Sequence, residues 1–179
     1  MITAVCSTDN QPVTVIAELK KPGRWRHGEV EVVVLKADAQ GLEFEDGDFV
    51  YIADPMAETC TVIGYKGNST TLEMPLTAWN GFVGHQYDVA AIGENAFAGN
   101  KELISVEMEW VKTIEKGAFS GCSKLKEVKC GQVTSIAEYA FSECPKLTIF
   151  TFGHNIEKIG AYAFYNCKSL VQLFGLDQN

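Results

Sequence analysis

The sequence lacks an excess of cations and lacks any long apolar run. Its 179 residues carry 15 Lys+Arg against 23 Asp+Glu, which gives a formal net charge of -8. This balance disfavours general binding to nucleic acid, because such binding depends on neutralising phosphates. It equally disfavours attachment to anionic lipid by charge. No stretch reaches the roughly 20 consecutive apolar residues of a membrane-spanning helix. We therefore expect no nucleic-acid partner and no membrane insertion.

Motifs for catalysis and metal binding are missing as well. The histidines His27, His85 and His154 are isolated, and the sequence contains neither Gly-x-Ser-x-Gly nor a glycine-rich phosphate loop. No Cys-x-x-Cys pair supplies the closely spaced thiolates that tetrahedral zinc sites use. From these absences we predict no enzyme activity, no cofactor and no metal.

A secretion signal is also missing from the given chain. Met1–Val5 is too short to be the apolar core of a signal peptide, and no basic residue precedes it. The sequence is compatible with a processed form, a cloned piece of a longer chain or a cytoplasmic protein, and it does not choose among them.

A motif recurs four times in the second half of the chain. Its form is Ile-x-x-x-Ala-Phe-x-x-(Cys/Asn)-x-x-Leu-x-x-hydrophobic, and a further apolar residue stands three residues before each start. The copies begin at Ile92, Ile114, Ile136 and Ile159, so successive starts lie 22 or 23 residues apart. Recurrence at a nearly fixed period predicts a solenoid, in which stacked coils join their apolar faces into one core.

Each copy is predicted to contain one short helix and one short strand. The apolar residues at offsets 0, 4, 5 and 8 fall on one face of two helical turns. Leu103, Val106 and Met108 end in the period-2 alternation of a strand, so stacking predicts a parallel strand ladder. The repeated Phe should be buried, and truncating Phe119 or Phe141 to Ala should cost about 3–5 kcal/mol.

The four copies resemble the BspA-like class of leucine-rich repeat, whose signature is Ile-Gly-x-x-Ala-Phe-x-x-Cys. Upstream, the segments 60–65, 67–72, 74–75 and 87–89 resemble the strand pair that leads into the first coil in that class. The resemblance covers about residues 48–179, although Asn100 replaces Cys in the first copy and the later copies lack the Pro-rich connectors of many members. It implies an α/β solenoid, a short right-handed leucine-rich repeat of about four 22–23-residue coils with a β-hairpin-rich N-terminal cap. It also implies a bacterial cell-surface or secreted location.

The chain divides into three predicted segments. Residues 1–47 lie outside the repeat, and the stretches 13–19 and 30–34 alternate as β-strands do. Lys21-Pro-Gly23 and Asp46-Gly47 are typical of turns, so this β segment either extends the cap or forms a small domain. Residues 48–90 are the β-hairpin lead-in, with a turn at Asn80-Gly81. Residues 91–179 hold the repeats.

Three of the six cysteines share one repeat position. Cys122, Cys144 and Cys167 should therefore stack in a line, about 5 Å apart if the coils keep the spacing of strands. Buried free thiols are the favoured interpretation, because cysteine packs as a small hydrophobe. Disulfide pairing and metal binding are the alternatives. A titration of the unfolded protein should then find all six thiols free.

The open face of the predicted ladder is the main candidate binding surface. If Val106 and Met108 point inward, the alternate residues face outward: Ser105, Glu107 and Glu109, then Glu127 and Lys129, then Ile149 and Thr151, then Gln172 and Phe174. Glu107 and Glu127 are predicted strand neighbours, either an acidic patch or a carboxylate pair for glycoside hydrolysis. A face that runs from acidic to apolar favours protein binding. Alternatively, Phe174 belongs to a C-terminal cap.

One basic run, Lys20–His27, stands apart from the repeats. Within it, Arg24, Trp25 and Arg26 could grip a glycan, a phosphate or an acidic partner by charge and stacking. The alternative is a solvated hairpin loop. Together these features predict a non-enzymatic binding or adhesion module for a protein or glycan ligand. The alternative function is a structural spacer or self-assembling unit of a larger surface protein, which would form homo-oligomers through its last coil.

Overall fold

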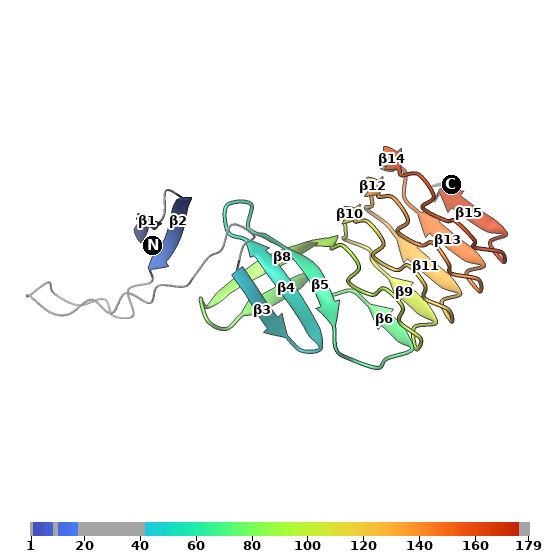
Figure 1. Cartoon of the computed structure of the whole chain (residues 1–179), viewed down its shortest axis with the longest axis horizontal. Coiled ribbons are helices and arrows are strands. Elements are labelled where there is room, and N and C mark those ends of the chain that lie inside the picture. Colours follow the sequence, from blue (N-terminus) through green and yellow to red (C-terminus); the bar gives the residue numbers. More distant parts are fainter. Residues whose placement is uncertain (1, 9–10, 18–41, 176–179) are drawn as a thin grey trace, which may run out of the picture.

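The structure is a computed structural model that describes the backbone of residues 2–8, 11–17 and 42–175, and side chains from residue 42 to residue 173 (Figure 1). Strands β1 (Ile2–Thr8) and β2 (Gln11–Ala17) form an antiparallel hairpin of their own. This confirms the predicted β structure over residues 13–17. The predicted strand at 30–34 and the turn at Lys21-Pro-Gly23 lie outside the described residues.

A cap of hairpins precedes the repeats. Strands β3 (Leu42–Asp46), β4 (Phe49–Asp54) and β5 (Thr59–Tyr65) form an antiparallel meander. The predicted Asp46-Gly47 turn joins β3 to β4, and glycine is suited to it because φ at Gly47 is 60°. Strand β8 (His85–Ile92) pairs with β5 in parallel and with β7 (Thr77–Asn80) in an antiparallel hairpin. Strands β3 and β4 therefore belong to one sheet, although residue 47, at which the predicted N-terminal segment ends, lies between them.

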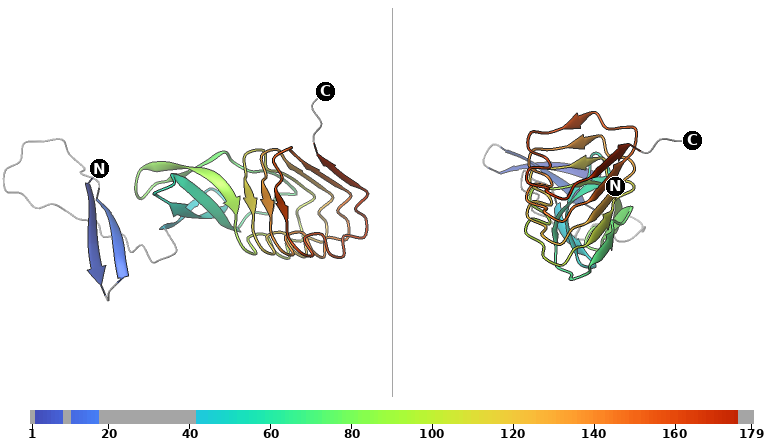
Figure 2. Two further views of the ribbon diagram at one scale, coloured as in Figure 1. Left: turned by 90° about the horizontal axis from the view of Figure 1, so that it is seen from above. Right: turned by 90° about the vertical axis from the view of Figure 1, so that its right-hand side faces the viewer.

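Two parallel ladders follow the cap on different sides of the stack (Figures 1 and 2). One continues the cap sheet from β8 through β10 (Thr113–Ile114), β12 (Ser135–Ile136) and β14 (Lys158–Ile159). The other joins β6 (Thr71–Glu73), β9 (Ser105–Glu107), β11 (Glu127–Cys130), β13 (Ile149–Phe152) and β15 (Gln172–Gly175). The predicted parallel ladder is therefore present, and its first strand comes from the cap.

The predicted short helices are wrong, because the described residues contain no helix. The stretch after β8 is a run of turns. Its backbone amides donate alternately to carbonyls of the same run and to carbonyls of the next copy. The Ala96 amide donates to Gly93 O within the same run, whereas the Phe97 amide donates to Ala118 O of the next copy, at 2.8 Å. An α-helix would need these amides for bonds four residues back along the chain.

The backbone dihedral angles also show that these runs are not helices, because they include residues in the left-handed conformation. Each copy has two residues with positive φ, four positions apart, and Asn95 and Gly99 take this conformation in the first copy. An L-residue in this conformation costs about 1–2 kcal/mol, so a right-handed helix does not contain it. The apolar residues at offsets 0, 4, 5 and 8 are buried just as well by turns. Bonds to the next copy take the place of helical hydrogen bonds.

The core runs along the stack from the cap into the fourth copy, where Ala163 is its last buried residue. The predicted burial of the repeated Phe is confirmed for Phe119 and Phe141, which are both 0% exposed. In the fourth copy the equivalent Phe164 is only partly buried. Ile159 is 44% exposed, whereas its three earlier equivalents are fully buried. The last copy thus leaves part of the core uncovered.

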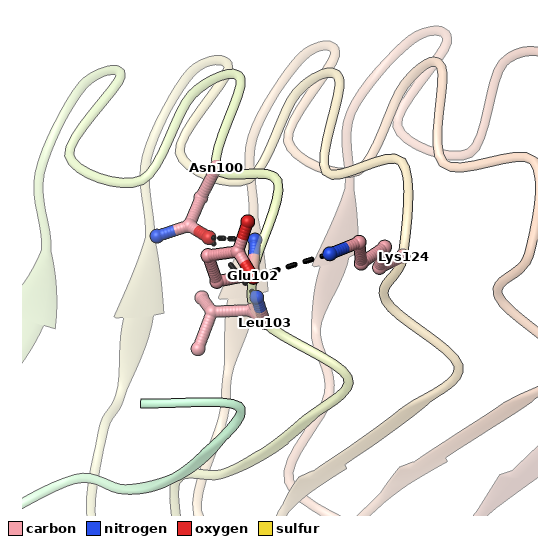
Figure 3. A network of polar contacts seen from close by, with 4 residues as sticks. All are labelled: Asn100, Glu102, Leu103 and Lys124. Carbon is pink, nitrogen blue, oxygen red and sulfur yellow. Dashed lines mark hydrogen bonds and ion pairs between the residues drawn. The ribbon is translucent and has the colours of Figure 1, made fainter. Parts of the chain in front are cut away.

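Asn100, which replaces Cys in the first copy, has a local role (Figure 3). Its Oδ1 accepts hydrogen bonds from the amides of Glu102 and Leu103, at 2.9 and 3.0 Å. Cys122 at the same position of the next copy instead donates to Phe97 O. The first copy packs on the cap, where Phe97 meets the ring of Tyr65, and not on another run of turns. A thiol there would have no equivalent carbonyl to bond, so the side chain binds amides of its own loop.

Candidate functional site

The outward face of the sheet β6-β9-β11-β13-β15 is built by strict alternation. Val106, Val128 and Phe150 point inward and are buried. The residues between them form two rows across the strands. The strand registers give these rows as Thr71–Ser105–Glu127–Ile149–Gln172 and Glu73–Glu107–Lys129–Thr151–Phe174. The predicted outward set is therefore confirmed on β9, β11 and β13, whereas in β15 the Phe174 side chain lies outside the described part and Leu173 is 47% exposed.

The predicted pairing of Glu107 with Glu127 is wrong. Glu107 lies opposite Lys129, and Glu127 lies opposite Ser105. The Lys129 Nζ also lies 3.5 Å from the Glu127 Oε1 in the same strand. Alternation fixes which residues point outward but leaves the register free by two residues. The pairing of Val106 with Val128 decides it. A cation therefore stands opposite Glu107 on β11, and the carboxylate that does lie opposite Glu107 is Glu73 of β6, on its other side.

Glu109 lies beyond the end of β9, on the bend that leads to β10. A methyl group added to Gly131 would overlap the Glu109 carboxylate, so this carboxylate lies directly over the glycine of the next copy. The contact brings negative charge close to the buried Cys130. Burial, and then the charge of Glu109, raise the pKa of the Cys130 thiol to about 12. Glu109 is thus exposed but belongs to the corner of the stack and not to the two rows.

The other predicted binding residues divide into two groups. Thr151 is half-buried and takes its place beside Lys129 in the second row. The backbone of Phe174 lies opposite Thr151 in β15, while its side chain lies outside the described part. Arg24, Trp25 and Arg26 lie outside the described residues too.

The cysteines at the repeat position form a line of thiols. Cys122, Cys144 and Cys167 each donate to the carbonyl of a repeated Phe in the preceding copy, at 3.2, 3.2 and 3.0 Å. All five cysteines between residues 42 and 173 are free. Within the same stretch no group of three or more His, Cys, Asp or Glu side chains could hold a metal ion. These three thiols therefore act as core packing with a satisfied S–H group.

Sequence reasoning missed a cavity in the cap. It has a volume of about 370 Å³, and its wall includes Asp46, Asp48, Tyr51, Tyr65 and Glu73. These residues come from β3, the β3–β4 turn, β4, β5 and β6, which meet only in the folded chain. The one local signal was the acidic stretch around Gly47, where carboxylates alternate with Phe44 and Phe49.

Comparison with known families decides what the repeats are. Residues 85–174, about half of the chain, match the BspA type Leucine rich repeat region in six copies. The chain belongs to this family. No curated protein matches the sequence. Among the described residues, no helix is long and apolar enough to cross a membrane.

Solved structures of bacterial leucine-rich repeat proteins share the fold. A protein from Bacteroides capillosus is 23% identical, with a TM-score of 0.66, and the match covers 75% of this chain and 99% of that one. A leucine rich cell surface protein from Faecalibacterium prausnitzii is 24% identical, with a TM-score of 0.58, over 78% of this chain and 44% of that one. The pneumococcal vaccine antigen PcpA is 18% identical, with a TM-score of 0.64, over 75% of this chain and 38% of its own. The chain thus spans less than half the length of the last two.

Proposed function

We propose that the chain is a non-enzymatic binding module of a bacterial surface or secreted protein, and that it contacts a protein or glycan through the outward face of the parallel sheet. In this proposal a right-handed solenoid of about four coils presents the face. The observation that carries the proposal is the pair of outward rows, which the fold itself leaves uncovered. Glu73, Glu107 and Lys129 are all exposed in one row.

The character of this face supports recognition of a mixed polar and apolar partner. The β6 and β9 end presents Glu73 and Glu107, whereas the β13 strand presents Ile149 and Thr151 beside them. Protein interfaces combine an apolar centre with a polar rim, and such a gradient supplies both. The printed descriptions of the F. prausnitzii and pneumococcal proteins, a cell surface protein and a vaccine antigen, support a location at the cell surface.

Screening the folded protein on arrays of glycans and of host matrix proteins tests this proposal. We expect saturable binding to a small set of spots by the folded chain, and loss of that binding after thermal unfolding. Binding that survives unfolding would indicate adhesion by an unfolded chain. Silence on both arrays would overturn the adhesion proposal.

A second candidate, self-assembly, is favoured by the exposed last copy. Val171 and Leu173 are 79% and 47% exposed, and Tyr162 and Tyr165 are also exposed. In earlier copies the position of Leu173 is filled by Val106, Val128 and Phe150, which are buried. Large exposed apolar surfaces often mark contacts with other chains.

Light scattering separates this candidate from the first. Assembly through the last copy predicts a dimer at micromolar concentration that becomes monomeric in Val171→Glu/Leu173→Glu. Phe82→Glu, at another exposed apolar residue in the cap hairpin, is the matched control and should leave the dimer unchanged. A monomer at all concentrations would exclude assembly through this end.

A further inference from the structure

The cavity in the cap lies where three parts of the chain meet. The β3–β4 turn, with Asp46, Gly47 and Asp48, forms one wall, and Phe49 and Tyr51 of β4 continue it. Tyr65, at the end of β5, and strand β6 form the other wall. The volume of about 370 Å³ falls within the range of about 300–1,000 Å³ that is typical of ligand-binding clefts.

Negative charge dominates this part of the molecule. Three carboxylates, Asp46, Asp48 and Glu73, line the cavity. Between residues 42 and 100 the sequence has one Lys or Arg, Lys66, and its ammonium is paired with Glu45. The further carboxylates in this stretch are Glu43, Asp54, Glu58, Asp88 and Glu94. The cavity therefore lies in a negative field that attracts cations and repels anions.

The carboxylates are held in place beside aromatic rings. The Trp79 amide donates to Asp46 Oδ2 at 2.8 Å, which fixes that carboxylate at the end of β3. Asp48 Oδ2 and the Tyr65 hydroxyl both lie against Gly67, where an added methyl group would overlap them. Phe49 and Tyr65 rest on each other, with ring centroids 5.1 Å apart. Aromatic faces attract cations, so rings and carboxylates here favour the same kind of ligand.

Tyr51 supplies an observation that does not depend on charge. It lines the cavity although it is only 1% exposed. Its hydroxyl makes no hydrogen bond with another described residue. No side-chain oxygen in the described part is both fully buried and unpaired, so this hydroxyl keeps some contact with solvent. Buried tyrosine hydroxyls are normally hydrogen-bonded. Because Tyr51 lines the cavity, a ligand or water bound there can pair with this hydroxyl.

The outer edge of β6 adds backbone groups to the same cavity. Thr70 O and the Met74 amide bond to β9. By alternation, the N–H and C=O groups of Thr71 and Glu73 point the other way. Strand β6 is the last strand of its sheet, and among the described residues these groups have no backbone partner. Thr71 and Glu73 are both exposed. A free strand edge can pair with an extended peptide.

We propose that this cavity binds a lysine or arginine side chain of an extended partner peptide, which pairs with the edge of β6. The cation lies between Asp46 and Asp48, against the ring of Tyr65, and the Tyr51 hydroxyl accepts a hydrogen bond from it. The peptide backbone pairs with Thr71 and Glu73. This site shares Thr71 and Glu73 with the outward rows, but Asp46, Asp48 and Tyr51 lie in the cap, so variants at these three residues test the site separately from the outward face.

Titration calorimetry on the full chain tests the site with a synthetic acetylated, amidated peptide, Thr-Val-Arg-Val-Thr. We expect saturable binding that Asp48→Asn and Tyr51→Phe each weaken by about tenfold or more, because a hydrogen bond to a charged group contributes that much. Binding should also weaken with added salt. Thermal unfolding of each variant checks that it still folds. The exchange Lys116→Glu/Glu138→Lys, at an exposed ion pair of the repeats whose residues do not line the cavity, is the matched control and should leave peptide binding unchanged.

Three further ligands separate the parts of the proposal. A peptide with Gln in place of Arg should bind at least tenfold more weakly, because it lacks the cation. A peptide N-methylated at alternate residues should also bind more weakly, because it cannot pair with β6. N-acetyl-arginine amide alone should bind more weakly than the whole peptide.

Some outcomes would overturn the proposal. Equal binding of the Gln peptide, or unchanged affinity in Asp48→Asn and Tyr51→Phe, would exclude a cation site in the cavity. Equal binding of N-acetyl-arginine amide would exclude pairing with the strand edge. Binding of a neutral glycan that Tyr51→Phe abolishes would assign the cavity to a different class of ligand.

Discussion

The ring of Phe119 lies parallel to that of Phe141, with the centroids 5.1 Å apart and an interplanar angle of 2°. Phe97 and Phe164 continue the stack on either side, at 4.9 and 5.6 Å. One motif position thus produces a column of rings along the molecule. Each ring fills the space that its neighbours leave, so the column joins the copies into one core.

Truncating a ring at the centre of this column should lower the free energy of unfolding more than truncating a ring at its end. We expect Phe141→Ala to lower the free energy of unfolding by about 3–5 kcal/mol, because the ring is fully buried. Phe164→Ala should cost less, because that ring is only partly covered. Urea denaturation of the two variants measures the difference. A loss below about 1 kcal/mol for Phe141→Ala would contradict a stacked core.

Glu143 has φ of 56°, at the position that glycine occupies in the first two copies, Gly99 and Gly121. Replacing it with glycine should raise the free energy of unfolding, because an L-residue is strained in this conformation. Glu143→Ala removes the same hydrogen bond to Asn166 but keeps the strain, so it is the control. We expect Glu143→Gly to be more stable than Glu143→Ala by about 1 kcal/mol in thermal unfolding. Equal stability would mean that the backbone relaxes at this turn.

Close contact between copies at one corner depends on glycine. A methyl group on Gly153 would overlap the carbonyl oxygen of Gly131 in the preceding copy. We expect Gly153→Ala to destabilise the fold by about 1–3 kcal/mol, the usual cost of overpacking. Gly64→Ala is the control, since the nearest atom to its methyl would be 3.6 Å away. If both variants unfold at the same urea concentration, the corner is looser than this contact implies.

Buried thiols should make the protein less stable in alkali. Burial raises the pKa of Cys60 and Cys130 from 9.0 to about 12. Below pH 9 these thiols are protonated in both states, and their contribution is fully present. As the pH rises from about 9 to about 12, the unfolded thiols ionise first, so the free energy of unfolding falls.

The double variant Cys60→Ala/Cys130→Ala isolates this effect. Its free energy of unfolding, measured by urea denaturation from pH 8 to pH 11, should fall less steeply than that of the unmodified chain. The other titrating groups are common to both proteins, and Cys60 also contributes to the raised pKa of Tyr51 and Tyr87, so the difference between the slopes reports on the thiols together with these two neighbours. Identical slopes would mean that these thiols are not held protonated by the fold.

The long-range pattern was easier to predict from the sequence than its local geometry. The 22-residue period gave the parallel ladder and the burial of Phe119 and Phe141, because stacked copies must join apolar positions. It did not exclude helices, because the same spacing suits turns. The positive φ angles of Tyr139 and Glu143 could not be predicted, because neither residue is a glycine. The Glu107–Glu127 pairing failed because it relied on alternation alone, which leaves the register free by two residues, whereas the 22-residue offset of the copies places Lys129 opposite Glu107.

The cavity in the cap could not be predicted from the sequence, for a different reason. This cavity is formed by residues between 46 and 75, which belong to two successive hairpins, β3–β4 and β4–β5, and to strand β6 of the other sheet. No periodic pattern connects Asp46 with Tyr65 or Glu73, so their proximity follows only from the fold. The outward rows, in contrast, follow from alternation on strands that repeat, and most of their residues were predicted.

A charge exchange on the sheet face tests the proposed function most directly. Glu107→Lys/Lys129→Glu reverses two facing charges at constant net charge. Lys116→Glu/Glu138→Lys does the same to an ion pair on the turns, where the Lys116 Nζ and the Glu138 Oε2 are 3.6 Å apart. On the glycan and matrix-protein arrays, we predict that the first exchange removes or redirects the binding of the unmodified chain and that the second leaves it unchanged. Binding that survives the first exchange, or that is lost only in the second, would contradict recognition through the outward face of the parallel sheet.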